Sequence, residues 1–345
     1  MFYLSKKLQD YVGARALDSR NDQDIFTWYV TMDDIDWMTY FVFSNTLTGY
    51  SIFLFIQDPL DKDQLFDHFI SGLRESLLYE GIKEEGVNYY CRALKYDYAK
   101  TNNRKIIGRT NVKHNDMVIG LDSLDVSRVN QKILNNKVNR IPFNNGENPL
   151  EQMMREFKTQ WDVHPVYKGY VIDITIDLEI DIVERQVVVP VQSTLGDLHG
   201  IIQKVFGWTD QHLHEFIDHA SNTSYTVLED FMEDDLYNAK AVSVKEAFKT
   251  GAKWTYIYDM GDYWQHTITV GDVYESSKPF PPFCTKARGE NIPENIGGVG
   301  GYQEYMHAIE DAQHPEHTMY KDMLKANDYR PFDMQIVNDR LSYML

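Results

Sequence analysis

The sequence predicts an α+β protein with two domains, and three observations lead to this prediction. The chain has 345 residues, which is longer than one ordinary domain. Strand-like runs of aromatic and β-branched residues accompany amphipathic helical patterns in both halves. An Asn-rich stretch with two prolines lies between the halves. Since 43% of the residues are hydrophobic, each half can bury its own core.

The first predicted domain covers residues 1–130. The segments "DWMTYFVF" (36–43) and "GYSIFLFIQ" (49–57) flank a polar turn and predict a strand pair. A helix follows, capped by Asp61 or Asp63 and ended by Gly81. Its apolar residues form one stripe: Leu65, Phe66, Phe69, Ile70, Leu73, Leu77 and Leu78. Two further short elements are expected before residue 130.

Residues 131–164 are expected to be a linker with a bridging helix. The stretch "NQKILNNKVNRIPFNNGENPLEQ" is rich in Asn and contains Pro142 and Pro149, a composition typical of boundaries. The bridging helix is predicted in "EQMMREFKTQWDV".

The second predicted domain covers residues 165–345 and opens with a strand hairpin. In "YKGYVIDITIDLEI" apolar and acidic residues alternate, and the apolar set is Val171, Ile174, Ile176, Leu178 and Ile180. "RQVVVPVQ" is its predicted partner. A helix in "STLGDLHGIIQKVFGW" is capped by Ser193 or Thr194 and stopped by Gly207. A strand in "HLHEFI" follows, and then two strands joined by "DMGDY", where Gly261 tolerates positive φ. The tail after residue 300 is predicted to be mostly helical.

Composition excludes several classes of protein. The formal net charge of -18, from 34 basic and 52 acidic side chains, argues against a broad nucleic-acid-binding surface. Cys91 and Cys284 are too few for a disulfide framework and are expected to be free thiols in a reducing cytoplasm. The N-terminal segment does not resemble a secretory signal, and the most apolar region is interrupted by polar residues. We therefore expect a cytoplasmic protein without a membrane span.

The main candidate site is a polar cluster in the second domain. His212 and His214 lie two residues apart, so a strand would place both on one face, as it would Asp262, Trp264 and His266. If the two strands are neighbours, these side chains converge with Asp259. Imidazoles and carboxylates suit a divalent transition metal, with His212, His214, Asp262 and His266 as its ligands. They also suit acid–base catalysis. A purely structural corner is the favoured interpretation, and no cofactor is predicted.

Two weaker candidates lie further along the chain. Gly297, Gly298, Gly300 and Gly301 in "GGVGGY" would suit an anion-binding loop, although a conformational role is favoured. In "HPEHTMY", His314, Glu316 and His317 could bind a metal, but a helix-capping segment is favoured.

Four motifs of the second half occur together and in order: "STLGDLHGIIQKVFGWTDQHLHEF", "YIYDMGDYWQHTITV", "NIGGVGGYQEYMHAI" and "FDMQIVNDRL". Over residues 165–345 they resemble the plasmid pRiA4b Orf-3-like family, also labelled insertion-sequence passenger TnpR. The resemblance implies a bacterial α+β protein of plasmids and mobile elements, with no established activity. The strand–strand–helix–strand opening looks like a β-grasp arrangement with a mixed sheet, packed helices and a helical C-terminal tail.

The first half resembles a separate uncharacterised bacterial domain, on "YLSKKLQDYVG", "LRESLLYEGI" and "YAKTNNRKIIGRTN". The second half departs from its family in two places. Glu184 stands where a tryptophan is usual, and Ile296 directly precedes Gly297 where members often have cysteines nearby, which argues against a thiolate metal site. The recombination that the TnpR label suggests would need a basic DNA-binding module, and this acidic chain shows none.

The functional expectation is a non-enzymatic accessory or interaction protein that binds a protein partner. The alternative is a metal-dependent enzyme or ligand sensor that uses the His/Asp cluster. DNA binding is the least favoured hypothesis because of the charge.

Overall fold

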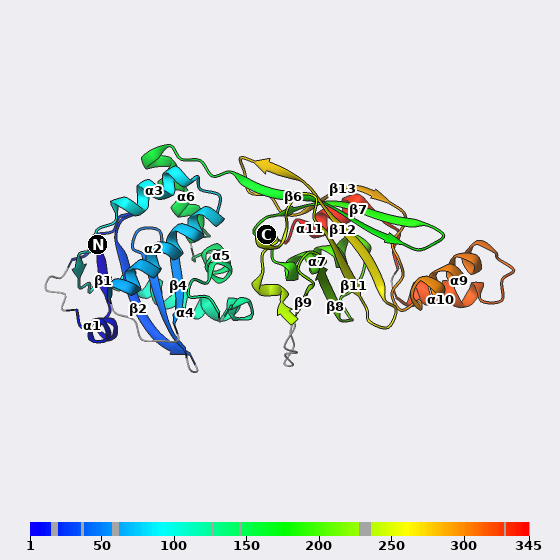
Figure 1. Ribbon diagram of the computed structural model, residues 1–345, viewed down its shortest axis with the longest axis horizontal. Helices are drawn as coiled ribbons and strands as arrows, with labels where there is room; N and C mark the ends of the chain where they lie inside the picture. The colour runs from blue at the N-terminus through cyan, green and yellow to red at the C-terminus, as the bar shows by residue number, and fades with distance from the viewer. Residues whose placement is uncertain are drawn as a thin grey trace. The chain divides into compact units, whose positions relative to one another are not determined.

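The computed structural model of the chain describes residues 1–14, 20–35, 38–56, 62–125, 127–144, 146–227, 236–327 and 329–344. The chain forms two compact units, Met1–Val166 and Tyr167–Leu345. Each unit packs helices on its own mixed sheet, so the α+β prediction is confirmed (Figure 1). No helix in these described ranges has both the length and the apolar character that crossing a membrane requires.

The sheet of the first unit has the strand order β4-β3-β2-β1-β5. Its strands are β1 (Phe2–Leu4), β2 (Trp28–Ile35), β3 (Met38–Asn45), β4 (Ser51–Ile56) and β5 (Tyr98–Ala99). Strands β2, β3 and β4 are antiparallel, whereas β1 pairs in parallel with β2 and β5. The helices are α1 (Lys6–Val12), α2 (Lys62–Tyr79), α3 (Glu84–Ala93), α4 (Arg104–Met117), the 3₁₀ helix η1 (Val118–Ser123), α5 (Lys132–Arg140) and α6 (Pro149–Trp161).

Helices cover both faces of this sheet. In β3, Phe41 and Phe43 join a core with residues of α2, α3 and α6, while Tyr40 and Val42 join a second core with residues of α4 and α5. The predicted strand pair and the apolar stripe of α2 therefore lie where expected. Residues 36, 37, 57 and Asp61 lie outside the described residues.

The segment expected to be a linker is part of the first unit. The Asn135 and Asn139 amides, one turn apart on α5, pair with the outer strand β4. Asn135 Oδ1 accepts from Phe53 N at 2.8 Å, and Asn139 bonds both Ser51 N and Ser51 O at 2.7 Å. The asparagine side chains thus satisfy backbone N–H and C=O groups of an edge strand, and they do not mark a flexible boundary. Helix α6 buries Leu150, Met153 and Phe157 in the core of the same unit.

The sheet of the second unit has the order β10-β9-β8-β11-β12-β6-β7-β13. Its strands are β6 (Tyr167–Asp177), β7 (Ile182–Pro190), β8 (His214–Asp218), β9 (Thr223–Thr226), β10 (Leu236–Asn238), β11 (Lys253–Tyr258), β12 (Trp264–Ser276) and β13 (Phe283–Arg288). The helices are α7 (Leu195–Phe206), η2 (Ala239–Ala241), α8 (Val244–Ala247), α9 (Gly298–Glu310), α10 (His317–Ala326) and α11 (Met334–Leu341). Apart from the parallel β9–β10 pair, neighbouring strands are antiparallel. The β-grasp detail of the expectation is not confirmed.

Helix α7 forms the core of this unit by packing on one face of the sheet. Thr194 and Asp197 form a capping box at its start, and Gly207 ends it with φ of 79°. Leu198, Ile201, Ile202 and Val205 are buried, as the helical spacing predicted. Ile180 is 51% exposed, because β6 ends at Asp177 and Ile180 lies in the turn that follows.

Candidate functional site

The polar residues that were expected to converge divide into two groups in the second unit. His212, Asp259 and Asp262 lie at a corner where the β11–β12 turn meets the start of β8 and the loop before α9. His214, Trp264 and His266 point to the α7 side of the sheet and are buried. The expected single cluster is therefore wrong in its geometry: the first group is joined by hydrogen bonds, whereas His214 and His266 are separate imidazoles in the core.

Backbone N–H groups and one imidazole surround the Asp259 carboxylate. Its Oδ1 accepts from Gly261 N at 2.9 Å and from Asp262 N at 3.3 Å. Its Oδ2 lies 3.4 Å from His212 Nε2, which is also 3.0 Å from Asn295 Oδ1. The carboxylate therefore fixes the turn and connects it to the segment just before β8, as the structural interpretation expected.

The Asp262 carboxylate connects the same turn to the start of α9. Its Oδ2 accepts from Gly297 N at 3.1 Å. A Cβ atom on Gly298 would lie 2.4 Å from Asp262 O, and one on Gly301 would lie 1.7 Å from Ile296 O. These glycines are thus needed for close backbone approach. The Asp262 carboxylate thus occupies the Gly297 N–H donor, which would otherwise be open to an external anion.

Positive φ in the β11–β12 turn occurs at Asp259 (59°) and Tyr263 (56°). Gly261 is not among the residues with positive φ, contrary to expectation. The absence of a side chain instead leaves room for the Asp259 carboxylate, since a Cβ atom on Gly261 would lie 3.2 Å from Asp259 Oδ1.

The buried group centres on a pair of stacked imidazoles. The rings of His199, on α7, and His214, on β8, are 3.5 Å apart and nearly parallel. His199 Nε2 lies 2.6 Å from Asp210 Oδ1, so it donates to the carboxylate, and Nδ1 accepts from the Tyr256 hydroxyl at 2.8 Å. Gln203 Nε2 also donates to Tyr256 Oη, at 3.1 Å. A continuous hydrogen-bonded chain thus connects Asp210 with the fully buried Tyr256.

Burial keeps two of the histidines neutral. It lowers the pKa of His214 to about 3 and that of His266 to about 4. The Nε2 atoms of both rings are buried without a hydrogen-bond partner in the described part of the chain. His266 Nδ1 donates to Trp264 O at 3.0 Å. These imidazoles are core groups and not exposed acids or bases.

The four residues predicted as a metal site are not brought together. His212 and Asp262 belong to the corner, whereas His214 and His266 belong to the core. Within the described ranges, the group of three or more His, Cys, Asp or Glu side chains close enough to share an ion lies elsewhere, at the α9–α10 turn. Trp264 lies near the end of α7, with its ring 6.2 Å from that of Trp208.

Arg185, on β7, is 1% exposed and has neutral acceptors for its guanidinium. Nε donates to Val205 O at 2.9 Å, and Nη1 donates to Glu184 O, Arg288 O and Gly289 O at 2.8 to 3.1 Å. Nη2 reaches Glu290 O and Asn291 Oδ1, and the Phe332 ring lies 4.0 Å away. Burial lowers the pKa of Arg185 to about 10. One buried cation therefore fixes the loop that follows β13.

This loop forms one wall of a cavity of about 460 Å³. The lining residues come from the end of α7, the loop after β13, and the α10–α11 region: Gly207, Trp208, Thr209, Gln211, Asn291, Ile292, Pro293, Glu294, Asn295, Leu324, Ala326, Asn327, Tyr329, Arg330 and Arg340. A volume of this size is typical of small-ligand sites.

Hydrogen bonds hold the cavity wall before any ligand arrives. Trp208 Nε1 donates to Ile292 O at 2.9 Å, and the Tyr329 hydroxyl donates to Asn291 O at 2.9 Å. Glu294 accepts from Thr209 N and from the Tyr258 hydroxyl, at 3.1 and 2.7 Å. Its carboxylate is thus engaged by the protein, whereas the exposed Arg340 pairs with no acidic side chain that the structure describes.

Sequence reasoning missed His199, Asp210, Arg185 and the cavity. His199 lies four residues after Leu195 and three before Ile202, so its place on the buried face of α7 was readable from helical spacing. The cavity joins residues more than 100 positions apart, and no local pattern indicates it.

The fold and site define a two-unit α+β protein with a polar cavity and a structural carboxylate corner in its second unit. The chain belongs to the family of the plasmid pRiA4b ORF-3-like protein, whose family model matches residues 168–340. Residues 1–152 match a domain of unknown function, DUF6933. The resemblances predicted for both halves are therefore confirmed.

Two similar proteins are themselves uncharacterised. The uncharacterized protein y4hQ of Sinorhizobium fredii (strain NBRC 101917 / NGR234) is 34% identical over 160 residues, which cover 46% of this chain and 81% of the relative. A crystal structure of the protein of unknown function MM3350 from Methanosarcina mazei Go1 aligns with a TM-score of 0.42 and 28% identity, covering 49% of this chain and 97% of that one.

Proposed function

We propose that the chain is a non-enzymatic binding protein whose second unit holds a small organic anion in the cavity beside Trp208. The observation that carries the proposal is the cavity of about 460 Å³, which has Arg330 and Arg340 in its lining and a preformed wall. Guanidinium groups bind carboxylates and phosphates through paired N–H donors.

The net charge of the chain favours small anions over long polyanions as the ligand. A net charge of -18 repels long polyanions such as nucleic acids. A compact carboxylate or phosphate can still be held through a short-range contact with the exposed Arg340, and this binding should weaken as the salt concentration rises. The alternative hypothesis of a ligand sensor in this unit is thus retained, with the ligand moved from the His/Asp cluster to the cavity.

The state of the nearby acidic groups favours binding over catalysis. Glu294, the acidic side chain in the cavity lining, already accepts hydrogen bonds from Thr209 and Tyr258. Asp259, at the adjoining corner, already accepts two backbone N–H groups. A general base would need a carboxylate or imidazole open to the ligand. An accessory role on plasmids or mobile elements and a protein partner remain part of this proposal.

Isothermal titration calorimetry with citrate and inorganic phosphate tests the proposal. We expect saturable binding of one anion per chain. Arg340→Met should weaken it about 10- to 100-fold, because a charged hydrogen-bonded contact contributes about 1.5–3 kcal/mol. Arg288→Met is the matched control, since the exposed Arg288 side chain is not in the cavity lining and lies near Asp181. Equal affinity in the wild type and Arg340→Met would refute the site.

A further inference from the structure

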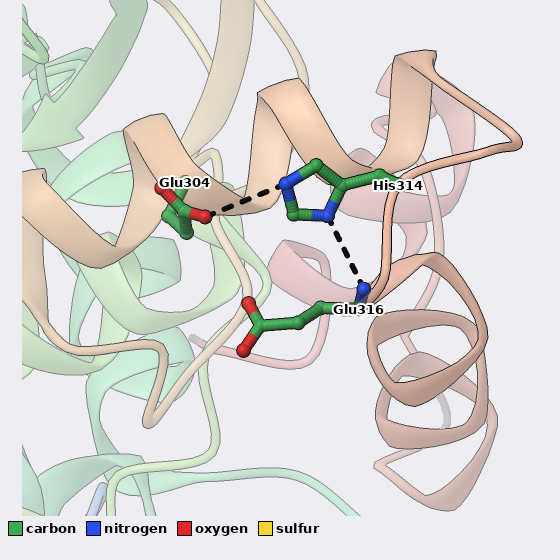
Figure 2. A group of neighbouring side chains, drawn as sticks. All are labelled: Glu304, His314 and Glu316. Carbon is green, nitrogen blue, oxygen red and sulfur yellow. Dashed lines mark hydrogen bonds and ion pairs between the residues drawn. The ribbon is translucent and has the colours of Figure 1, made fainter.

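Three potential metal ligands meet at the turn between α9 and α10. Glu304 lies on α9, and His314 and Glu316 lie in the turn before α10. One donor atom from each side chain lies within 4.8 Å of the other two. Figure 2 shows both carboxylates beside the imidazole, with His314 Nε2 3.6 Å from Glu304 Oε1.

The backbone of this turn is fixed by its own hydrogen bonds. Asp311 accepts from Gln313 N through Oδ1 and from His314 N through its carbonyl, both at 2.9 Å. His317 Nδ1 donates to Ala308 O at 2.7 Å and so connects α10 to α9. His314 and Glu316 therefore lie in a turn whose backbone is already ordered, and Glu304 lies on a helix, so binding an ion costs less conformational entropy.

The donor set has the composition of a transition-metal site. Two carboxylates and one imidazole suit a divalent first-row ion, whereas magnesium and calcium prefer oxygen donors alone. Neither Glu304 nor Glu316 pairs with a lysine or arginine in the described part of the chain. Two carboxylates thus face one imidazole without a fixed cation to compensate them.

Binding has a definite cost at His314. Its Nδ1 accepts from Glu316 N at 3.2 Å, so Nε2 carries the proton in the neutral ring. An ion on Nε2 requires this proton to move to Nδ1, which gives up the hydrogen bond from Glu316 N and costs about 1 kcal/mol.

We propose that Glu304, His314 and Glu316 hold a divalent first-row transition metal ion that ties α9 to the turn before α10. Such an ion would stabilise the helical pair without taking part in the anion site, since none of its ligands lines the cavity. The proposal is thus independent of the proposed function.

Calorimetry on the full chain, purified without a His tag and with Zn²⁺ as the probe, tests this site. We expect one Zn²⁺ per chain and no comparable signal with Mg²⁺. His314→Ala and Glu304→Gln should each weaken binding at least about tenfold, since each removes one of three ligands. Glu304 is exposed and glutamine has nearly the same shape, so Glu304→Gln should stay folded. Its Zn²⁺ affinity therefore tests the site even if His314→Ala unfolds the turn.

Glu310→Gln, an exposed change on the same helix, and His212→Ala, at the separate corner, should retain wild-type affinity. Absence of Zn²⁺ binding in the wild type would overturn the proposal. Unchanged affinity in Glu304→Gln, or loss of the ion in His212→Ala alone, would overturn it as well.

Discussion

Replacement of Arg185 by methionine is the perturbation with the largest expected effect on the second unit. Methionine keeps most of the buried volume but removes six hydrogen bonds and the contact with Phe332. Val205 O lies in the core and loses its donor, which costs about 1–3 kcal/mol. The acceptors on Arg288, Gly289 and Glu290 are near solvent and recover part of their hydrogen bonding from water.

A second contribution has the opposite sign. Burial lowers the pKa of Arg185 to about 10, so removal of the cation relieves a desolvation cost. Together these effects predict a net loss of about 1–3 kcal/mol in the free energy of unfolding of this unit. For a unit of this size the melting temperature should fall by about 3–10 °C.

Thermal unfolding followed by circular dichroism measures the effect, and urea titration confirms it. Arg288→Met, at the exposed end of β13, should shift the melting temperature by less than about 2 °C. Arg185→Lys should recover little, because a single ammonium cannot reach all of these carbonyl groups. If Arg185→Met unfolds at the wild-type temperature, the claim that this cation fixes the loop is wrong.

Three further predictions concern both units. Asp262→Ala should cost about 0.5–2 kcal/mol, since Gly297 N at the start of α9 loses its acceptor; urea unfolding measures this, and an unchanged midpoint would contradict it. The pKa of His214 is lowered to about 3 in the folded state, so the unfolded chain binds the proton first and stability falls as pH drops from about 6.5 towards 4. His214→Leu should flatten that decline by up to about 1.4 kcal/mol per pH unit, and an unaltered pH profile would count against it. Asn139→Ala should destabilise the first unit by about 2–4 kcal/mol, because Ser51 N and O both lose their partner; retained hydrogen-exchange protection at Ser51 would exclude this role.

Local patterns predicted the elements of this chain well. The stripe of α2, the capping box of α7 and the strands on either side of the β11–β12 turn all follow from spacing of three to four residues or of two. The composition of residues 131–164 led to the wrong prediction of a linker, because asparagine is common in domain boundaries and is also a side-chain hydrogen-bond partner of edge strands. Only the position of β4 distinguishes the two cases.

The candidate site was less accessible to such reasoning. Parity placed His212 and His214 on one strand face, but β8 begins at His214, so His212 is free to turn towards Asn295. Arg185 is indistinguishable by sequence from an exposed arginine on a strand. Its burial depends on carbonyl groups of residues 288–290, about 100 positions away, and such contacts need the assembled fold.

The central claim, that a small anion binds in the cavity beside Trp208, can be tested by following the indole N–H signals of the six tryptophans in ¹H–¹⁵N correlation spectra during titration with citrate. Trp208→Phe assigns the signal that belongs to the cavity, where Trp208 Nε1 donates to Ile292 O. We expect the Trp208 signal to shift saturably, while the signals of Trp28 and Trp161 in the first unit stay in place. A citrate titration that leaves the Trp208 signal unmoved, or that shifts Trp28 and Trp161 equally, would contradict the account.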